Sequence, residues 1–129
     1  MFTTIMTTPN QPSKTGPKRG DVILVPFPNS DLRTAKLRPG LIVQADNLET
    51  GISQVVLAMI SSNLSRAGHQ SRVLILTSTN IGKQSGLLFD SIVMCDNLAT
   101  VSINAVNRTI GHLDDQAEVE DALRHTLGL

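Results

Sequence analysis

The sequence predicts a mainly β domain: a small, mostly antiparallel barrel with one α-helix packed on it at the C-terminal end. Short apolar runs rich in Val, Ile and Leu recur along the chain, separated by polar or glycine-containing stretches, which is typical of strands and turns. The last part of the chain changes to a helical hydrophobic period. Strands and helices do not alternate, so a parallel sheet is not indicated, and 129 residues suffice for one domain.

The chain divides into a tail and a domain. Residues 1–17 are rich in Thr and Pro and show no sustained hydrophobic period, which predicts a flexible N-terminal tail. Residues 18–129 then form the domain.

Six strands are expected in this domain. The first two, at residues 22–27 and 41–44, flank a polar stretch at 28–37, which we expect to be a loop long enough to carry a function. The continuous apolar run of the third strand indicates burial on both faces. The remaining elements are expected as strands at 54–60, 72–76, 92–95 (continuing at 98–101) and 109–113, a loop at 77–86 and a turn or short helical piece at 102–107.

The C-terminal helix has the clearest signals in the sequence. Val119, Ala122, Leu123 and Leu127 fall on one helical face. Acidic residues fill the first turns after a capping residue at 114 or 115, and glycine follows the last turn, as helix ends favour. This helix is expected to begin near residue 114.

Charge is balanced overall but unevenly distributed. The chain contains eleven Lys or Arg and eleven Asp or Glu, and this zero net charge argues mildly against a dedicated nucleic-acid binder. However, residues 14–38 contain six basic and two acidic residues, whereas residues 114–121 contain five acidic and none basic. The two ends of the domain are therefore expected to differ in sign.

Some sites and compartments are disfavoured. The single cysteine, Cys95, excludes an internal disulfide and cannot form a zinc site alone, and its apolar neighbours predict a buried, inert thiol. His112, just before the helix, is expected to be a packing or capping residue. No phosphate-binding glycine motif, membrane-length apolar run or signal peptide is evident, so we expect a cytoplasmic protein.

Arg38 is the first candidate for chemistry on a phosphodiester. It ends the polar stretch, and Pro39 favours an extended backbone at this position. A planar, always charged guanidinium can neutralise the negative charge that develops on the non-bridging oxygens when RNA is cleaved, without a metal ion. The structural alternative is a solvated loop arginine, or one in an ion pair with Asp31 or Asp46.

The hydroxyl and proton-transfer groups are less well defined. Ser61 and Ser62 follow the third strand and can present hydroxyls to the same phosphate, although serines there also commonly satisfy the turn backbone. The proton-transfer group is open between Asp31, Asp96 and His69. Asp96 can equally be part of an Asx-type turn.

The order of several segments resembles that of the MazF/PemK family of toxins, ribonucleases of bacterial type II toxin–antitoxin systems. The resemblance runs from about residue 18 to residue 127. It rests on R-G-D-V at 19–22, Arg38-Pro39 before an apolar strand, the Ser61-Ser62 strand exit, and the segments VMCDNLATV and TIGHLDD.

This resemblance implies an SH3-like small β-barrel that forms a homodimer and cleaves single-stranded RNA without a metal, leaving a 2′,3′-cyclic phosphate and a 5′-hydroxyl. Arg38 matches the family's catalytic arginine, and Ser61 matches its functional threonine. Asp96 matches a position that is an acid with a proton-transfer role in part of the family. The residues expected to bind RNA are Arg33, Lys36, Ser62, Asn63 and Asn97.

Three positions depart from the family pattern. Arg33 occupies the place of a glutamate in the first loop, so a carboxylate is lost there unless Asp31 substitutes for it. Asn97 stands where glutamine is common, and Met94 replaces an arginine found in some members. These departures bear on the rate and the cleavage sequence rather than on the fold.

The sequence therefore predicts the toxin of a type II toxin–antitoxin system, a sequence-specific endoribonuclease acting through the 2′-hydroxyl of RNA. Its expected partners are single-stranded RNA, a cognate antitoxin and a second copy of the chain; no metal or cofactor is expected. The alternative is a catalytically weakened barrel that serves as an RNA- or protein-interaction module. A gyrase-poisoning toxin ranks last, because such toxins act through a tryptophan-bearing end and this chain has no tryptophan.

Overall fold

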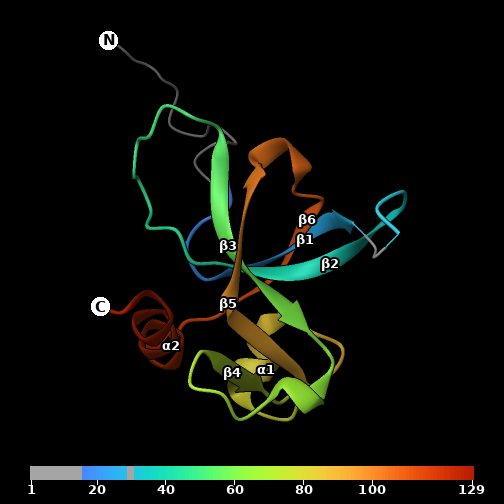
Figure 1. Cartoon of the computed structure of the whole chain (residues 1–129), viewed down its shortest axis with the longest axis vertical. Coiled ribbons are helices and arrows are strands. Elements are labelled where there is room, and N and C mark those ends of the chain that lie inside the picture. The colour runs from blue at the N-terminus through green and yellow to red at the C-terminus, as the bar shows by residue number, and fades with distance from the viewer. Residues whose placement is uncertain (1–15, 29–30) are drawn as a thin grey trace.

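One strongly curled antiparallel sheet forms the body of the molecule in the computed structural model, which describes residues 16–28 and 31–129 (Figure 1). Its strand order is β4-β5-β3-β2-β1-β6, so the sheet forms a half-barrel. The strands are β1 (Asp21–Pro28), β2 (Ala35–Ile42), β3 (Gln54–Ser61), β4 (Arg72–Ile75), β5 (Ser91–Ser102) and β6 (Arg108–His112). The helices of the described ranges are α1 (Asn80–Ser85) and α2 (Ala117–Leu127), with short 3-10 helices η2 (Leu64–Arg66) and η3 (Ile103–Ala105). The predicted fold class is confirmed, whereas most of the predicted tail lies outside the described residues.

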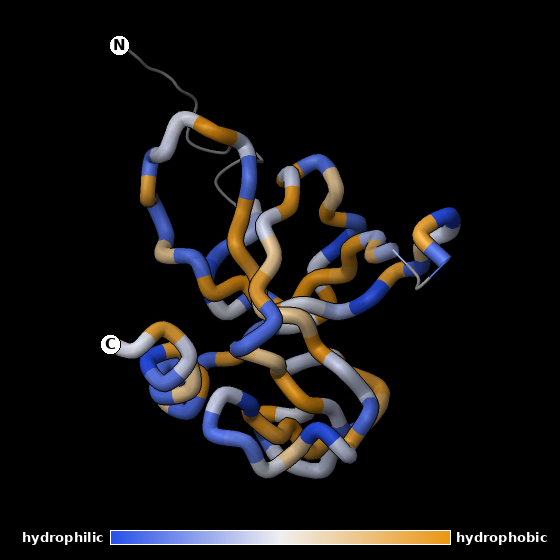
Figure 2. Tube along the Cα trace, in the orientation of Figure 1, coloured by the Kyte–Doolittle hydropathy of each residue, from blue (hydrophilic) through white to orange (hydrophobic). Residues whose placement is uncertain are grey.

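Two apolar clusters, one on each face of the curled sheet, explain the unbroken apolar runs. Val22 belongs to the cluster under α2 and its neighbour Ile23 to the other cluster, and Leu41 and Ile42 divide in the same way. Side chains alternate between the faces of a strand, so a strand buried on both sides is apolar throughout. Figure 2 shows apolar segments where the strands cross in the middle of the molecule.

The R-G-D-V motif has a structural role. Gly20 is left-handed (φ 93°), and a Cβ there would collide with side chains of Gln116 and His112. Asp21, only 7% exposed, accepts a hydrogen bond from the Lys18 amide (3.0 Å) and pairs with His112 Nδ1 (2.8 Å). The motif therefore ties the start of β1 to the end of β6, and His112 is the packing residue that the sequence predicts.

The predicted long loop at 28–37 is wrong in extent, because β2 begins at Ala35. Pro28 lies opposite Ala35 and Phe27 opposite Lys36, so the connection between the two strands is residues 29–34. The first residues of β2 are exposed and polar in part, and for this reason they read as a loop in the sequence. The strand also ends earlier than predicted, at Ile42 rather than at residue 44.

Helix α1 was not predicted, because six residues are too few to show a helical period. Its ends do carry local signals: the Thr79 side chain accepts a hydrogen bond from the Gly82 amide, and Gly86 is a left-handed C-cap. The final helix, α2, begins at Ala117, later than expected, and its C-cap Gly128 agrees with the prediction. β5 continues across both predicted pieces, and η3 is the helical piece expected after it.

The close approach of α1 to β6 is testable by adding one methyl group. Gly86 has φ 71°, and a Cβ there would overlap the carbonyl oxygen of Ile110, whereas Gly51 has φ 79° and open space around it. We expect Gly51→Ala to lower the free energy of unfolding by about 1 kcal/mol, the cost of a left-handed alanine. Gly86→Ala should cost about 3 kcal/mol or more, because the carbonyl must also move. Equal losses in urea unfolding would contradict this packing.

Candidate nucleic-acid interface

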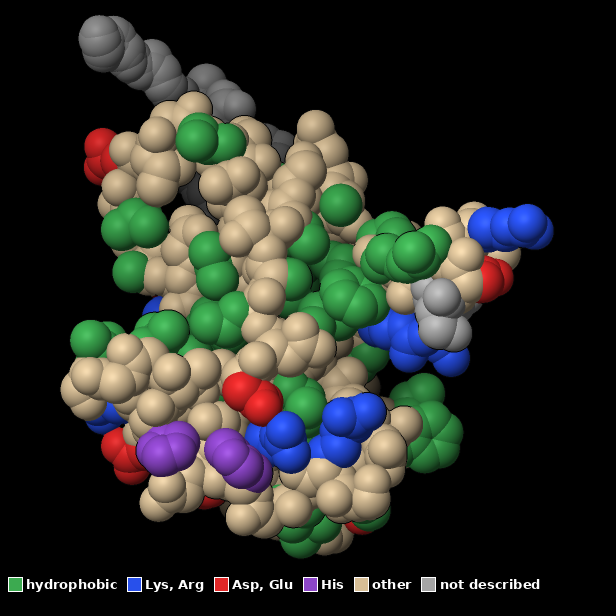
Figure 3. All heavy atoms as spheres, in the orientation of Figure 1, with side chains coloured by type: hydrophobic (Ala, Val, Ile, Leu, Met, Phe, Trp, Pro, Cys, Tyr) green, Lys and Arg blue, Asp and Glu red, His purple; other side chains and the backbone are tan. Residues whose placement is uncertain are grey.

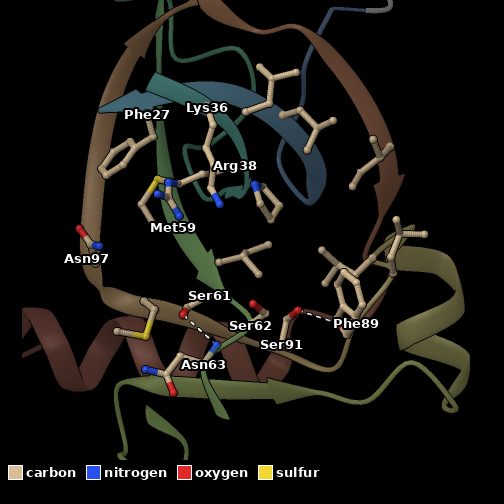
Figure 4. A pocket seen from close by; sticks show the side chains of 18 of the residues that line it. Phe27, Lys36, Arg38, Met59, Ser61, Ser62, Asn63, Phe89, Ser91 and Asn97 are labelled. Atoms are coloured by element: carbon tan, nitrogen blue, oxygen red, sulfur yellow. Dashed lines mark hydrogen bonds between the residues drawn. The ribbon is translucent and has the colours of Figure 1, made fainter. Parts of the chain in front are cut away.

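An open cleft of about 810 Å³ is hollowed into the molecule, with walls from β1, β2, β3, η2, the α1–β5 connection, β5 and β6 (Figure 4). The cleft opens where β2 and β3 part. Gly40 lies opposite Met59, but neither Pro39 nor Arg38 pairs with β3, and both pair with β1 instead. Proline has no amide hydrogen to donate, so the ladder between the two strands cannot continue in the usual way.

The parting of the strands sets Arg38 across from the end of β3. If the register of β2 and β3 continued, Arg38 would lie opposite Ser61. Instead, Ser61 pairs with Ile92 of β5, and the two side chains line opposite parts of one cleft. Figure 4 shows Arg38 on the β2 wall and Ser61 and Ser62 on the β3 wall.

Arg38 is a strand residue rather than a loop residue. It pairs with Val25 in the β1–β2 ladder, its residue is half-buried, and its Nε atom is buried. Lys36 lies two residues earlier on the same strand, so both side chains project from the same face. A cation on a paired strand is held more rigidly than one on a long loop.

The cleft is cationic, although the chain as a whole is neutral. The basic residues that line it are Lys36, Arg38, Arg66 and Arg108. No Asp or Glu is found among the described lining residues. Figure 3 shows this face, where Lys and Arg side chains gather beside a central hydrophobic area. The acidic residues of α2 are not among its lining residues, so the cleft suits a polyanion such as RNA. The predicted difference in sign between the two ends of the domain is a separate matter, because Arg19 of the basic stretch pairs with Glu120 of α2.

The polar residues at the end of β3 are partly committed to the backbone. Ser61 Oγ accepts a hydrogen bond from the Asn63 amide (3.1 Å), and Asn63 Oδ1 accepts bonds from the amide (3.2 Å) and hydroxyl (2.7 Å) of Ser65. The turn role that the sequence left open for Ser61 is therefore real. The hydroxyl proton of Ser61 can still be donated, as can the hydrogens of the Asn63 side-chain amide.

Six of the nine predicted site residues are brought together in the cleft. They are Lys36, Arg38, Ser61, Ser62, Asn63 and Asn97. The other three, Asp31, Arg33 and Asp96, are not among its lining residues.

Asp96 points away from the cleft because β5 bulges at this position. Ala58 lies opposite Leu98 and Met59 opposite Met94, so residues 95–97 have no partner on β3. Asn97 lines the cleft, whereas Asp96 forms two hydrogen bonds with the Arg72 guanidinium, at 3.3 and 2.9 Å. These bonds hold the pKa of Asp96 below its ordinary value, although desolvation opposes them. An ionised, paired carboxylate outside the cleft is poorly placed to transfer protons there.

Asp31 and Arg33 belong to the exposed β1–β2 connection. Asp31 Oδ1 accepts hydrogen bonds from the amides of Arg33 (2.9 Å) and Thr34 (3.1 Å), and these bonds lower its pKa. The carboxylate thus shapes its own turn, as Asp commonly does.

The remaining titratable candidates also lie outside the cleft. His69 Nδ1 accepts a hydrogen bond from the Ser71 amide (3.0 Å), and its ring packs edge-on against His125 at 6.0 Å. Cys95 is buried, which raises the pKa of its thiol to about 11, with a further contribution from the Asp96 charge. In the described part of the chain, no cluster of three or more His, Cys, Asp or Glu is arranged to hold a metal.

Sequence reasoning missed two cleft cations. Arg108 reaches the site because β6 pairs with β1, where Leu24 lies opposite it, and Arg66 does so because η2 folds back after β3. Both contributions depend on long-range pairing or a three-residue turn, and no local motif marks either arginine.

Comparisons with known proteins identify the family and the fold of the chain. A family model described as "PemK-like, MazF-like toxin of type II toxin-antitoxin system" matches residues 18–127. An endoribonuclease in complex with its cognate antitoxin, from a Mycobacterial species, is 21% identical, with a TM-score of 0.68 over 88% of this chain and 97% of that one. No curated protein matches the chain significantly.

Two further solved structures are similar. The Mycobacterium tuberculosis toxin MazF-mt6 is 22% identical, with a TM-score of 0.66 over 84% of this chain and 97% of that one. MazF from Deinococcus radiodurans is 17% identical, with a TM-score of 0.64 over 88% and 98%. At such identities these structures show a shared fold. Across residues 16–28 and 31–129, no helix has the length and apolar character needed to cross a bilayer.

The structural role of Asp96 predicts a pH dependence of stability. The pKa of Asp96 is lowered in the folded state, so its ionised form stabilises the fold. This contribution to the free energy of unfolding is fully present above the unfolded pKa, near 4. It is lost as the pH falls through the folded pKa. We expect Asp96→Asn to lower the free energy of unfolding by about 1 kcal/mol at pH 7. The difference from wild type should shrink as the pH falls below the unfolded pKa and through the lowered folded pKa of Asp96.

Urea unfolding across this pH range measures the effect. Asp121→Asn is the matched control, because that carboxylate is 81% exposed and pairs with Arg124 at the surface. A difference for Asp96→Asn that persists unchanged at low pH would contradict the ion-pair assignment.

Proposed function

The chain belongs to the PemK-like, MazF-like toxin family of type II toxin–antitoxin systems, and we propose that it cleaves single-stranded RNA in the cationic cleft without a metal ion. The observation that carries the proposal is the segregation of charge: four cations and no described carboxylate line the cleft of a chain with zero net charge. A mycobacterial protein of similar fold is named an endoribonuclease.

Arg38 is the central residue of the proposed mechanism. The 2′-hydroxyl of the nucleotide attacks the adjacent phosphorus, a 2′,3′-cyclic phosphate forms, and the bond to the 5′-oxygen of the next nucleotide breaks. Negative charge builds up on the non-bridging oxygens, and the guanidinium of Arg38 neutralises it with paired N–H donors. The Ser61 hydroxyl, across the cleft, donates to the same phosphate.

The other cations hold the flanking phosphates. Lys36 shares a face of β2 with Arg38, Arg66 lies beside the end of β3, and Arg108 lies on β6. Because they come from three separate elements, they suit successive phosphates of an extended strand. Phosphate contacts of this kind fix position and register, whereas contacts to the bases fix sequence.

Proton transfer is assigned to water in this mechanism. The described lining of the cleft contains no carboxylate, imidazole or thiol, and the cleft is open to solvent. The 2′-hydroxyl proton therefore passes to water or hydroxide, and the leaving 5′-oxygen takes a proton from water. Catalysis then depends on preorganised positive charge rather than on a side-chain base.

The same feature favours a second candidate function. A cleft with cations but no proton-transfer side chain can hold RNA, or an acidic protein segment, without cutting it. If the chain is such a catalytically weakened interaction module, RNA should bind tightly and remain intact.

We also propose a cognate antitoxin and a second copy of this chain as partners in the cytoplasm. Solved structures of similar fold include an endoribonuclease with its cognate antitoxin and MazE–MazF from Deinococcus radiodurans. The cationic and apolar lining of the cleft suits an acidic segment with apolar side chains.

Replacing Arg38 tests the mechanism directly. We expect Arg38→Ala to lower the cleavage rate by about 10²-fold or more, because the charge that meets the transition state is lost. Arg38→Lys should recover only part of the rate, since an ammonium cannot donate two parallel hydrogen bonds. Primer extension on RNA treated with purified protein gives the new 5′ ends and their yield.

Arg124→Ala is the matched control, because Arg124 is an exposed arginine on α2 outside the cleft. If Arg38→Ala and wild type give the same discrete 5′ ends at the same rate, the assignment fails. If Asp96→Asn loses as much activity as Arg38→Ala, transfer through water alone is wrong.

The salt dependence of RNA binding tests the remaining cations. The binding constant for a single strand falls as salt rises. A plot of its logarithm against the logarithm of the salt concentration has a slope of about −0.7 for each phosphate neutralised. The four lining cations therefore predict a slope of about −3. We expect Arg108→Ala to reduce the steepness by about 0.7 and Arg124→Ala to leave it unchanged. Titrations at several salt concentrations measure both, and an unchanged slope for Arg108→Ala would exclude a phosphate contact there.

A further inference from the structure

An exposed aromatic side chain stands at the edge of the cationic cleft. The described part of the chain contains two phenylalanines, Phe27 and Phe89, and both line the cleft. Phe27 packs against one of the apolar clusters, whereas Phe89 is 69% exposed. Full burial of such a side chain is worth about 1.5–3 kcal/mol, and Phe89 contributes little of this to folding. An exposed aromatic beside a binding cleft suggests a ligand contact.

The backbone around Phe89 is held in place before any ligand arrives. Gly86 fixes the start of the connection by its left-handed conformation and close packing. Asp90 Oδ1 accepts hydrogen bonds from the amide (2.8 Å) and hydroxyl (3.0 Å) of Thr77. The Ser91 hydroxyl donates to the carbonyl of Phe89 itself (2.7 Å). An aromatic ring on such a connection can bind a ligand with little loss of backbone entropy.

The position of the ring indicates the chemistry of that ligand. In the view of Figure 4, Phe27 and Phe89 lie on opposite sides of the cleft, and Arg38 lies on the same side as Phe27. A ligand that reaches across the cleft from Arg38 to the exposed ring of Phe89 would combine negative charge with a flat, apolar ring. A nucleotide does so, and bases of unpaired RNA commonly stack on aromatic side chains.

We propose that Phe89 is the platform on which one unpaired RNA base stacks while the adjoining phosphates bind the cleft cations; this rests on the proposed function. Both faces of a base within a duplex are covered by its neighbours, so the platform selects single-stranded RNA. Every base has a π-face, so the contact tolerates different sequences at that position.

Short 2′-O-methyl oligoadenylate is a suitable probe, because it lacks the 2′-hydroxyl needed for cleavage and its purines stack strongly. We expect Phe89→Ala to weaken its binding by about 5- to 150-fold, the range that 1–3 kcal/mol for one stacked base gives. The salt slope should stay unchanged, because no charge is lost. Ile52→Ala, also an exposed apolar residue but remote in the β2–β3 connection, is the control and should bind as wild type does.

Tryptophan fluorescence reports stacking separately from affinity. The chain has no tryptophan, so Phe89→Trp introduces a single fluorophore. We expect this variant to bind the probe at least as tightly as wild type and its emission to be quenched on binding. Ile52→Trp should show no quenching.

The outcomes separate this inference from the function on which it rests. If wild type binds the probe and Phe89→Ala binds equally well, the stacking platform is wrong and the cationic cleft stands. If wild type neither binds the probe nor cleaves RNA, both proposals fail. If Phe89→Ala changes the oligomeric state in sedimentation while its affinity for the probe is unaltered, the ring is a protein contact and the inference is overturned.

Discussion

The site depends on one constraint in the sheet: β2 cannot stay paired with β3 along its whole length. Pro39 offers no amide hydrogen, and from this point toward its start β2 pairs with β1 alone. The end of β3 stays paired with β5 alone, so a gap opens with Arg38 on one side and Ser61 on the other. The Arg-Pro dipeptide therefore combines two roles. The proline opens the cleft, and the residue before it supplies the charge.

The two apolar clusters allow this gap without unfolding the sheet. Each is built on a different face, so the strands remain anchored on both sides of the opening. Burial on both faces also makes the strands rigid, and a cation on a rigid strand is already oriented for a phosphate. Five of the eleven acidic residues lie on or just before α2, where Glu120 contacts Arg19 rather than a cleft cation. Charge separation and the layered core thus support the same function.

Features of the structure that depend on local sequence patterns could be predicted, whereas features that depend on contacts between distant residues could not. The positions of most strands, the terminal helix and its C-cap follow from local apolar patterns and were predicted, whereas the start of β2 was not. Arg38 and Ser61 were predicted from their strand ends, and the structure brings both to the cleft. Three features were not predicted: the pairing of β6 with β1 places Arg108, a three-residue turn places Arg66, and α1 is too short to show a helical period. Asp96, a predicted catalytic residue, lies outside the cleft for a subtler reason. A bulge decides which of Asp96 and Asn97 faces the cleft, and sequence periodicity does not reveal it.

That bulge has an electrostatic consequence for the mechanism. A carboxylate inside the cleft would pair with the lining cations and repel a phosphate, at a cost that rises as water is excluded. In β5, Asn97 lines the cleft and can form hydrogen bonds there, whereas Asp96 lies outside it and pairs with Arg72. The cleft therefore contains no negative charge from β5. The resemblance to the family implies a glutamate at the place of Arg33, so this chain lacks that carboxylate in the connection beside β2. Both features act in the same direction, toward the proposed site, which binds phosphate charge and leaves proton transfer to water.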